Sequence, residues 1–224
     1  MKGLWWVDMK NVLLIGLGRF GRYTASKLYD LGHQVMAVDK DEERVSKVLN
    51  YVTNAVIGDG TDKDFIASLG VPNYDLCIVA IGDDFLSSLE TTSLLKDYGA
   101  KKVVSRATMA SQEKFLLRNG ADYVVFPERQ LGTWTAIRYS SDNIENFFEL
   151  MDGYAVFEVR APDSWDGRKI GELDVRKKYG VNILGIRRPQ EKIDMNIAYD
   201  TVLQAGQTML ILGKQDDMQK ILKL

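Results

Sequence analysis

Short apolar runs alternate with amphipathic stretches along the first 126 residues of the chain. Runs of this kind, rich in Val and Ile, are typical of strands that are buried on both faces. They predict strands at residues 11–16, 34–39, 54–59, 75–82, 101–107 and 122–126. The stretches between them predict helices at residues 19–31, 41–51, 61–69, 84–98 and 110–119. The repeated strand–helix order predicts an α/β fold with a Rossmann-like, doubly wound parallel sheet.

The pattern changes after Pro127. Residues 128–151 are predicted to form a helical connector that breaks near Ser140. Strand-like runs then follow at residues 154–162, 181–188 and 208–214. One short helical stretch lies between them, at residues 172–180. This mixture predicts a second, smaller α+β domain of ~80 residues.

Composition agrees with a soluble globular protein. Hydrophobic residues make up 46% of the 224 residues and the formal net charge is −2, so we expect no nucleic-acid partner. The single cysteine, Cys77, lies in an apolar run and is predicted to be a buried hydrophobic residue in a reducing compartment. No segment has the ~18 apolar residues that would span a bilayer.

A glycine fingerprint, Gly16-x-Gly18-x-x-Gly21, joins the first predicted strand to the first predicted helix. The first glycine permits the tight turn, the second lets backbone approach a phosphate, and the third lets helix and strand pack closely. Asp39 ends the second strand, near the ~20-residue offset at which a carboxylate binds ribose hydroxyls. This combination predicts a bound nucleotide, and the acid argues against a 2′-phosphate and hence against NADP.

The fingerprint does not identify the nucleotide, because NAD, NADH, ATP, ADP and AMP all contain adenosine with phosphate. An NAD-dependent oxidoreductase is the alternative function, but we find no proton donor for hydride transfer. The only histidine, His33, is expected on the surface in a turn at the amino-terminal side of the sheet, away from the ligand edge. A nucleotide-sensing transcription regulator would need a basic winged-helix domain, which the sequence lacks.

Polar and glycine residues follow the other predicted strands where ligands bind in open α/β sheets. Asp59 follows the third strand and could contact adenine or cap the next helix. Gly82 and Arg106 follow the fourth and fifth strands. Arg19 lies at the helix entrance, where it could contact phosphate or remain a solvated surface residue. Glu128 could contact the ligand or be an ordinary acid of a helix N-terminus.

Several segments together resemble the RCK family, the regulators of potassium conductance. They are "VLLIGLGRFG", "VMAVDKDEERV", "GDGTDKDFIASLGV", "DLCIVAIG" and "LLRNGADYVVFPERQLG". More narrowly, the chain is similar to the cytoplasmic gating subunits of Ktr/Trk-type bacterial potassium uptake systems. The resemblance implies a nucleotide-binding RCK N-terminal domain with its crossover helix at residues 9–140, and an RCK C-terminal regulatory domain at 141–224.

The resemblance also implies a role for each site residue. The three glycines would hold phosphates and Asp39 the ribose, while Arg19 would reach the terminal phosphate. Glu128 would help to hold a cation beside that phosphate. Arg19 and Glu128 together favour ATP and ADP over NAD and NADH. The full set expected at the nucleotide is Gly16, Gly18, Arg19, Phe20, Gly21, Asp39, Lys40, Asp59, Gly60, Ile81, Gly82, Arg106 and Glu128.

In this family, subunits pair through their N-terminal domains and assemble into a homo-octameric ring beneath a membrane ion-translocating dimer. The resemblance therefore implies a non-enzymatic regulator at the inner face of the cell membrane. It further implies a cyclic di-AMP site in the C-terminal domain. The residues expected there are Ile170, Arg176, Asn182 and Ile183. The alternative is an ordinary domain core with a surface arginine. Trp5 and Trp6 belong to an extension that the family does not explain, and they could form an interface patch or simply pack as part of a tail.

Overall fold

The computed structural model describes residues 8–222, and these fall into two compact units that divide between Arg129 and Gln130. The division lies within helix α6 (Pro127–Tyr139). The boundary implied by the resemblance, after residue 140, lies at the end of the same helix and stays a prediction. Trp5 and Trp6 lie outside the described residues. No helix among the described residues is long and apolar enough to cross a membrane.

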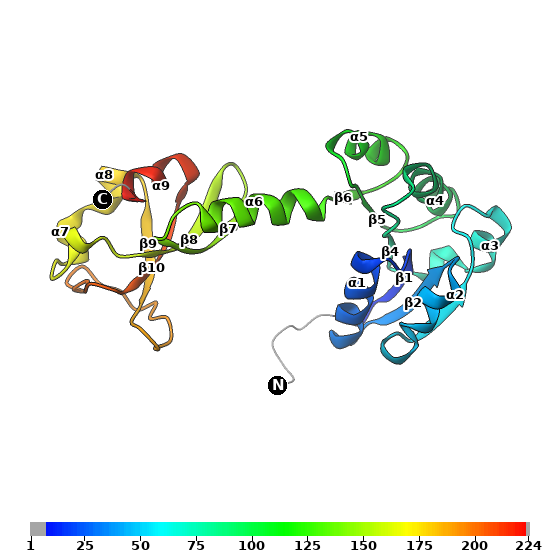
Figure 1. Cartoon of the computed structure of the whole chain (residues 1–224), viewed down its shortest axis with the longest axis horizontal. Coiled ribbons are helices and arrows are strands. Elements are labelled where there is room, and N and C mark those ends of the chain that lie inside the picture. The colour runs from blue at the N-terminus through cyan, green and yellow to red at the C-terminus, as the bar shows by residue number, and fades with distance from the viewer. Residues whose placement is uncertain (1–7, 223–224) are drawn as a thin grey trace. The chain divides into compact units, whose positions relative to one another are not determined.

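The first unit is a six-stranded parallel sheet with strand order β3-β2-β1-β4-β5-β6 (Figure 1). Its strands are β1 (Asn11–Ile15), β2 (Gln34–Asp39), β3 (Asn54–Ile57), β4 (Leu76–Val79), β5 (Val103–Arg106) and β6 (Tyr123–Val125). Its helices are α1 (Arg19–Asp30), α2 (Glu42–Ser46), α3 (Lys63–Ser68), α4 (Phe85–Asp97) and α5 (Ala110–Arg118), with 3₁₀ turns η1 (Leu49–Tyr51) and η2 (Val71–Asn73). The predicted Rossmann-like fold is confirmed.

Strand β1 is buried on both faces, as its continuous apolar run predicts. Val12 and Leu14 belong to one hydrophobic cluster, whereas Leu13 and Ile15 belong to another. The alternation follows from the two-residue period of a strand, which sends successive side chains to opposite faces. Because the strand order reverses direction between β1 and β4, a crevice forms at the carboxyl ends of these strands.

The cysteine and the histidine of this unit, Cys77 and His33, are both buried. Cys77 is fully buried in β4, and burial raises the pKa of its thiol to about 12, as expected of a hydrophobic residue. The prediction for His33 is wrong, because the side chain is 7% exposed rather than on the surface. Its Nδ1 accepts a hydrogen bond from the backbone N–H of Lys10, at 3.3 Å. This contact ties the turn before β2 to the residue before β1.

The second unit is a four-stranded antiparallel sheet with strand order β7-β8-β10-β9. Its strands are β7 (Ile144–Glu149), β8 (Tyr154–Arg160), β9 (Asn182–Arg187) and β10 (Thr208–Lys214). The other elements are a 3₁₀ turn η3 (Asp163–Trp165) and helices α7 (Ile170–Leu173), α8 (Val175–Tyr179) and α9 (Gln215–Leu222). The expected α+β class of this region is confirmed.

The prediction of a helical connector up to residue 151 is wrong for the part that follows its expected break near Ser140. Helix α6 ends at Tyr139, and residues 144–149 form β7, which pairs with β8. Phe147 is 3% exposed and stacks on Phe157 of β8, with ring centroids 5.8 Å apart. Two adjacent phenylalanines favour a strand, and this contact with a segment ten residues later in the chain decides the outcome.

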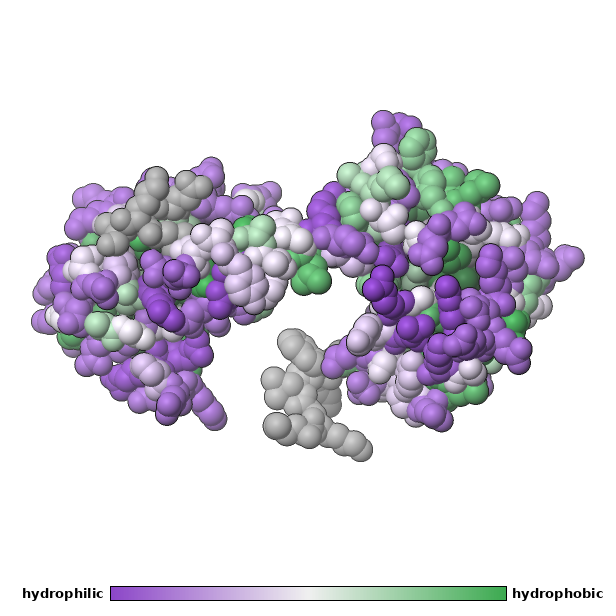
Figure 2. Space-filling view, in the orientation of Figure 1, coloured by the Kyte–Doolittle hydropathy of each residue, from purple (hydrophilic) through white to green (hydrophobic). Residues whose placement is uncertain are grey.

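Apolar side chains are also exposed on the first unit. Figure 2 shows hydrophobic surface over α5 and the adjoining part of the unit. Phe115 and Leu117 of α5 are 49% and 46% exposed, and Met109, at the start of that helix, is 62% exposed. Leu86 at the start of α4 is 70% exposed. Such a group of exposed apolar residues is typical of a protein–protein interface.

Candidate functional site

A cavity of about 770 Å³ opens at the carboxyl edge of the parallel sheet. This volume lies within the ~300–1,000 Å³ of small-molecule sites. Every residue of the expected nucleotide set lines the cavity except Gly21. The lining also includes residues that the sequence did not indicate: Ile15, Arg22, Arg44, Gly58, Ala80, Asp83, Asp84, Ser87 and Pro127.

The three fingerprint glycines have different structural surroundings. Gly16 has φ +100°, and a Cβ added there would lie 2.9 Å from the backbone nitrogen of Ile81. Gly21 is packed against Gly16, since an added Cβ would lie 1.9 Å from the Gly16 carbonyl oxygen. Gly18 has nothing within 4 Å of such a Cβ. The first and third glycines are therefore required by packing, whereas Gly18 leaves backbone open towards the cavity.

Asp39 is a buried carboxylate at the end of β2, with 6% of its surface exposed. Its Oδ2 accepts a hydrogen bond from the Leu17 N–H at 2.6 Å, and its Oδ1 accepts one from the Asp41 N–H at 3.0 Å. These bonds fix the carboxylate beside the glycine turn. Because a carboxylate has about four acceptor positions, two remain for hydroxyl groups of a ligand.

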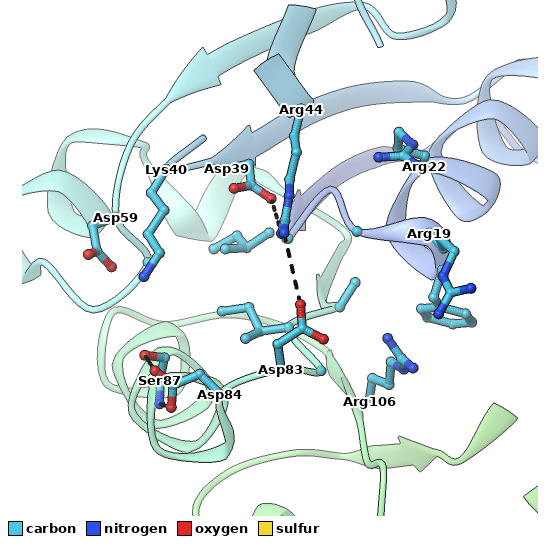
Figure 3. Close-up of a pocket in the computed structure, with 18 of the residues that line it drawn as sticks. Arg19, Arg22, Asp39, Lys40, Arg44, Asp59, Asp83, Asp84, Ser87 and Arg106 are labelled. Atoms are coloured by element: carbon cyan, nitrogen blue, oxygen red, sulfur yellow. Dashed lines mark hydrogen bonds and ion pairs between the residues drawn. The ribbon is translucent and has the colours of Figure 1, made fainter. Parts of the chain in front are cut away.

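Three of the arginines in the lining gather at one end of the cavity. Figure 3 shows Arg19, Arg22 and Arg106 on one side, and Asp59, Asp84 and Lys40 on the other. The arginines lie on the side of the α1 N-terminus. That helix has neither an acidic residue in its first turn nor a side-chain cap. Its free N–H groups and the nearby guanidinium groups favour an anion here.

Arg106 and Glu128 form an ion pair at the cationic end of the cavity. The Nη2 of Arg106 donates to Oε1 of Glu128 at 2.5 Å, and the Arg106 side chain is only 15% exposed. The guanidinium also lies over the Phe20 ring, 5.5 Å from its centroid. A Cβ on Gly82 would lie 2.5 Å from Arg106 Nη1, so the glycine makes room for the arginine.

The position of Glu128 agrees with both roles that the sequence suggested, an acid at a helix N-terminus and a residue at the ligand. It lies in the first turn of α6, as a helix N-terminal acid does, and it also lines the cavity. Within residues 8–222, no group of three or more His, Cys, Asp or Glu side chains could hold a metal ion. The partner of Glu128 in this chain is Arg106, and a role in cation binding stays a prediction.

Asp59 and Asp84 have distinct local roles. Asp59 does not cap α3, because the cap is Asp62, whose Oδ1 accepts from the Asp64 and Phe65 N–H groups. Hydrogen bonds from the backbone and side chain of Thr61 lower the pKa of the Asp59 carboxyl. Asp84 caps α4, and bonds from Ser87 lower its pKa. The capping alternative for Asp59 is therefore wrong, and its side chain is left at the cavity.

Arg44 is one of the lining residues that the sequence did not reveal. It lies on α2, and its guanidinium is 3.7 Å from Asp39 Oδ2, 3.5 Å from Asp41 Oδ2 and 3.9 Å from Asp83 Oδ2. Figure 3 shows the side chain between Asp39 and Asp83. One sequence feature could have indicated this residue: Arg44 lies early in the helix that follows β2, and that helix begins at the ligand edge of the sheet.

The cyclic di-AMP candidates lie within one segment of the second unit. Ile170 of α7 and Ile183 of β9 are half-buried and pack against the hydrophobic core. Arg176 of α8 and Asn182 at the start of β9 are exposed. The isoleucines thus have a core role whether or not a ligand binds, and the ligand role of all four residues stays a prediction.

Comparison with known proteins identifies both halves of the chain. Residues 12–127 match the TrkA-N domain and residues 154–224 match the TrkA-C domain. The chain is 35% identical over 214 residues to Ktr system potassium uptake protein C of Bacillus subtilis, covering 96% of each protein. It is 33% identical over 217 residues to Ktr system potassium uptake protein A of Vibrio alginolyticus, covering 96% of this chain and 97% of that protein.

Solved structures show the same fold. The GsuK RCK domain matches 99% of this chain with a TM-score of 0.66 and 18% identity, and this chain spans 48% of that one. The GsuK channel bound to NAD matches 96% of this chain with a TM-score of 0.66, over 39% of the channel chain. With both domains matched in order and relatives aligned over nearly their full length, the chain belongs to the TrkA-N/TrkA-C family of Ktr-type potassium uptake proteins.

Proposed function

We propose that this protein is the cytoplasmic, nucleotide-sensing gating subunit of a Ktr-type potassium uptake system. It binds ATP and ADP at the carboxyl edge of its parallel sheet and regulates potassium movement through a membrane subunit. The observation that carries the proposal is the cavity in which the glycine turn and Asp39 meet the Arg106–Glu128 ion pair.

The two ends of the cavity fit the two ends of an adenine nucleotide. Asp39 has acceptor positions for ribose hydroxyls, and a 2′-phosphate would bring negative charge against this buried carboxylate. The α1 N-terminus, Arg19 and Arg106 provide donors for phosphates at the other end. NAD and NADH share the adenosine and the diphosphate, so they are the second ligand class, and the GsuK channel, which has the same fold, has been solved bound to NAD.

The ion pair gives the site a means to respond to phosphate. A phosphate oxygen near Arg106 competes with Glu128 for the same guanidinium, since both are anionic acceptors. Glu128 lies in the first turn of α6, in which the division between the two compact units falls. Phosphate at Arg106 therefore changes the electrostatics at the start of this helix.

The lining suits binding rather than catalysis. Among the described residues around the cavity there is no histidine, cysteine or tyrosine. Its carboxylates already accept local hydrogen bonds or form ion pairs at Asp39, Asp59, Asp84 and Glu128. We therefore expect slow or no turnover of bound nucleotide, and this expectation separates the proposal from an oxidoreductase.

The proposed assembly is a homodimer that builds a homo-octameric ring on its membrane partner. The exposed apolar residues of α4 and α5, together with Met109, suit pairing of N-terminal domains. Gating by a ligand requires different affinities for two quaternary states, and moving such an equilibrium from 1:99 to 99:1 needs about 5.5 kcal/mol. Several subunits acting together share this requirement.

The second part of the proposal is that the C-terminal domain binds cyclic di-AMP. Arg176 is exposed on α8 with Lys177 and Lys178, in a helix whose last turn is basic. A guanidinium here suits a phosphate, and the half-buried Ile170 and Ile183 offer apolar surface to a purine.

Mass measurement, calorimetry and a flux assay test the proposal. Light scattering on the purified chain should give a ring of eight subunits, and calorimetry should show ATP and ADP binding without turnover. Potassium uptake in a transport-deficient bacterium should require the membrane subunit and increase when this protein is added. Oxidation of NADH with a carbonyl substrate, or uptake that is unchanged by this protein, would contradict the proposal.

A further inference from the structure

We infer that Arg44 is the residue that selects the base of the bound nucleotide, by lying flat on a purine. This inference rests on the proposed function and adds a residue and a specificity to the same cavity. Among the guanidinium groups of the described lining, Arg44 is the one that lies beside Asp39, the expected ribose carboxylate, whereas Arg19, Arg22 and Arg106 lie at the phosphate end.

The position of the base follows from the fixed groups around it. With phosphates at the α1 N-terminus and ribose at Asp39, the base must continue away from the arginine-lined end. The walls there are formed by Asp59 and Gly60 after β3 and by Ile81 after β4. Ile81 is half-buried and offers an apolar surface to one face of a base.

Arg44 is placed to cover the other face. Its guanidinium lies between Asp39 and Asp83, at 3.7 and 3.9 Å, and so spans the opening between the end of β2 and the β4–α4 loop (Figure 3). A base that enters between these two walls must meet this guanidinium. A planar guanidinium stacks well on an aromatic ring, whereas the compact ammonium of a lysine does not.

The contacts that hold Arg44 in place are weak enough to be exchanged. The Arg44 side chain is 40% exposed and Asp83 is 90% exposed, so their ion pair is screened by solvent. All three of its partners are carboxylates: Asp39, Asp41 and Asp83. When Arg44 stacks on a base, it can lose its ion pair with Asp83 and stay close to Asp39. The positive charge of the guanidinium is then still balanced by the Asp39 carboxylate.

Base preference provides the test. ATP and UTP share ribose and triphosphate but differ in the size and stacking strength of the base. Calorimetry on the full chain should show that Arg44→Ala weakens ATP binding about 10-fold and UTP binding much less, which lowers the ATP-to-UTP preference. Arg44→Lys should restore little of this preference, because it retains charge and not the stacking plane.

Arg19→Ala is the matched control, since it removes a guanidinium from the phosphate end of the same cavity. It should weaken ATP and UTP by similar factors and leave their ratio unchanged. Unfolding temperatures of the variants should stay close to that of the wild type, because the Arg44 side chain is 40% exposed and the buried Asp39 keeps its hydrogen bonds from the Leu17 and Asp41 N–H groups. Equal losses for ATP and UTP in Arg44→Ala, or full recovery in Arg44→Lys, would overturn the inference. A wild type that binds no adenine nucleotide would instead contradict the proposed function.

Discussion

Arg106 donates a hydrogen bond to Glu128 over 2.5 Å, and this bond joins the end of β5 to the first turn of α6. The pair stands at the cationic end of the cavity, where it balances the charge of a guanidinium that is largely buried. Substituting either residue therefore changes the charge that a bound phosphate encounters at this end of the cavity.

Glu128→Ala should strengthen the binding of ADP by about 3- to 10-fold, equivalent to about 0.7–1.4 kcal/mol. The variant removes the anion that competes with phosphate for Arg106. Calorimetry with and without Mg²⁺ measures the effect. Glu113→Ala is the control, because Glu113 also forms an ion pair with an arginine, Arg129, at 3.2 Å, but does not line the cavity. Weaker ATP binding that occurs only with Mg²⁺ would instead assign Glu128 to cation binding.

Alanine substitutions should separate the folding and binding roles of the glycine turn. Gly21→Ala is expected to destabilise the fold by about 3 kcal/mol or more, because its Cβ would overlap the Gly16 carbonyl oxygen. Gly18→Ala is expected to cost less than about 1 kcal/mol, since its surroundings are open and its φ is −61°. Urea unfolding measures both. Gly18→Ala should still weaken ATP binding, and unchanged binding would show that phosphate does not approach this backbone.

Asp122 should make the stability of the first unit depend on acid pH. A hydrogen bond from Lys96, followed by one from the Val103 N–H, lowers the pKa of this carboxyl below its ordinary 3.8. A group with a lowered folded-state pKa stabilises the protein above the unfolded value and loses this effect as the pH falls below it. Asp122→Asn should therefore cost about 1 kcal/mol at pH 7 and progressively less below pH 3.8.

Urea unfolding across this pH range measures the Asp122 contribution. Glu90→Gln provides the control, because it removes an exposed carboxylate from α4. A difference between wild type and Asp122→Asn that stays constant down to the most acidic condition would contradict the assignment, since it would show that the carboxylate charge is not involved.

Arg176→Ala should weaken cyclic di-AMP binding by at least about 10-fold, because it removes a charge-assisted bond to phosphate. Lys177→Ala, on the same short helix, should have a smaller effect and controls for net charge. Substituting Ile170 or Ile183 is less informative, since both pack against the core and would also lower stability. Equal binding by wild type and Arg176→Ala would remove this residue from the site.

The parts of the fold that the sequence predicts are those in which local pattern and burial agree. Residues 12–15 of β1 are all apolar because both faces of a central parallel strand are covered. The turn from Gly16 to Gly21 and the carboxylate of Asp39 were predictable for a similar reason. The turn needs glycine at fixed positions, and the carboxylate stands at a fixed strand end.

Tertiary structure alone decided the features that depend on contacts between distant segments. The Phe147 segment is a strand because β8 lies beside it, and the buried His33 accepts a hydrogen bond from the backbone N–H of Lys10, which precedes β1. Two ion pairs at the cavity join residues that are far apart along the chain. Arg44 and Asp83 are separated by 39 residues, and Arg106 and Glu128 by 22. Periodicity reports which face of an element is buried, but the orientation of a long charged side chain is set by the charges that the folded chain brings within its reach.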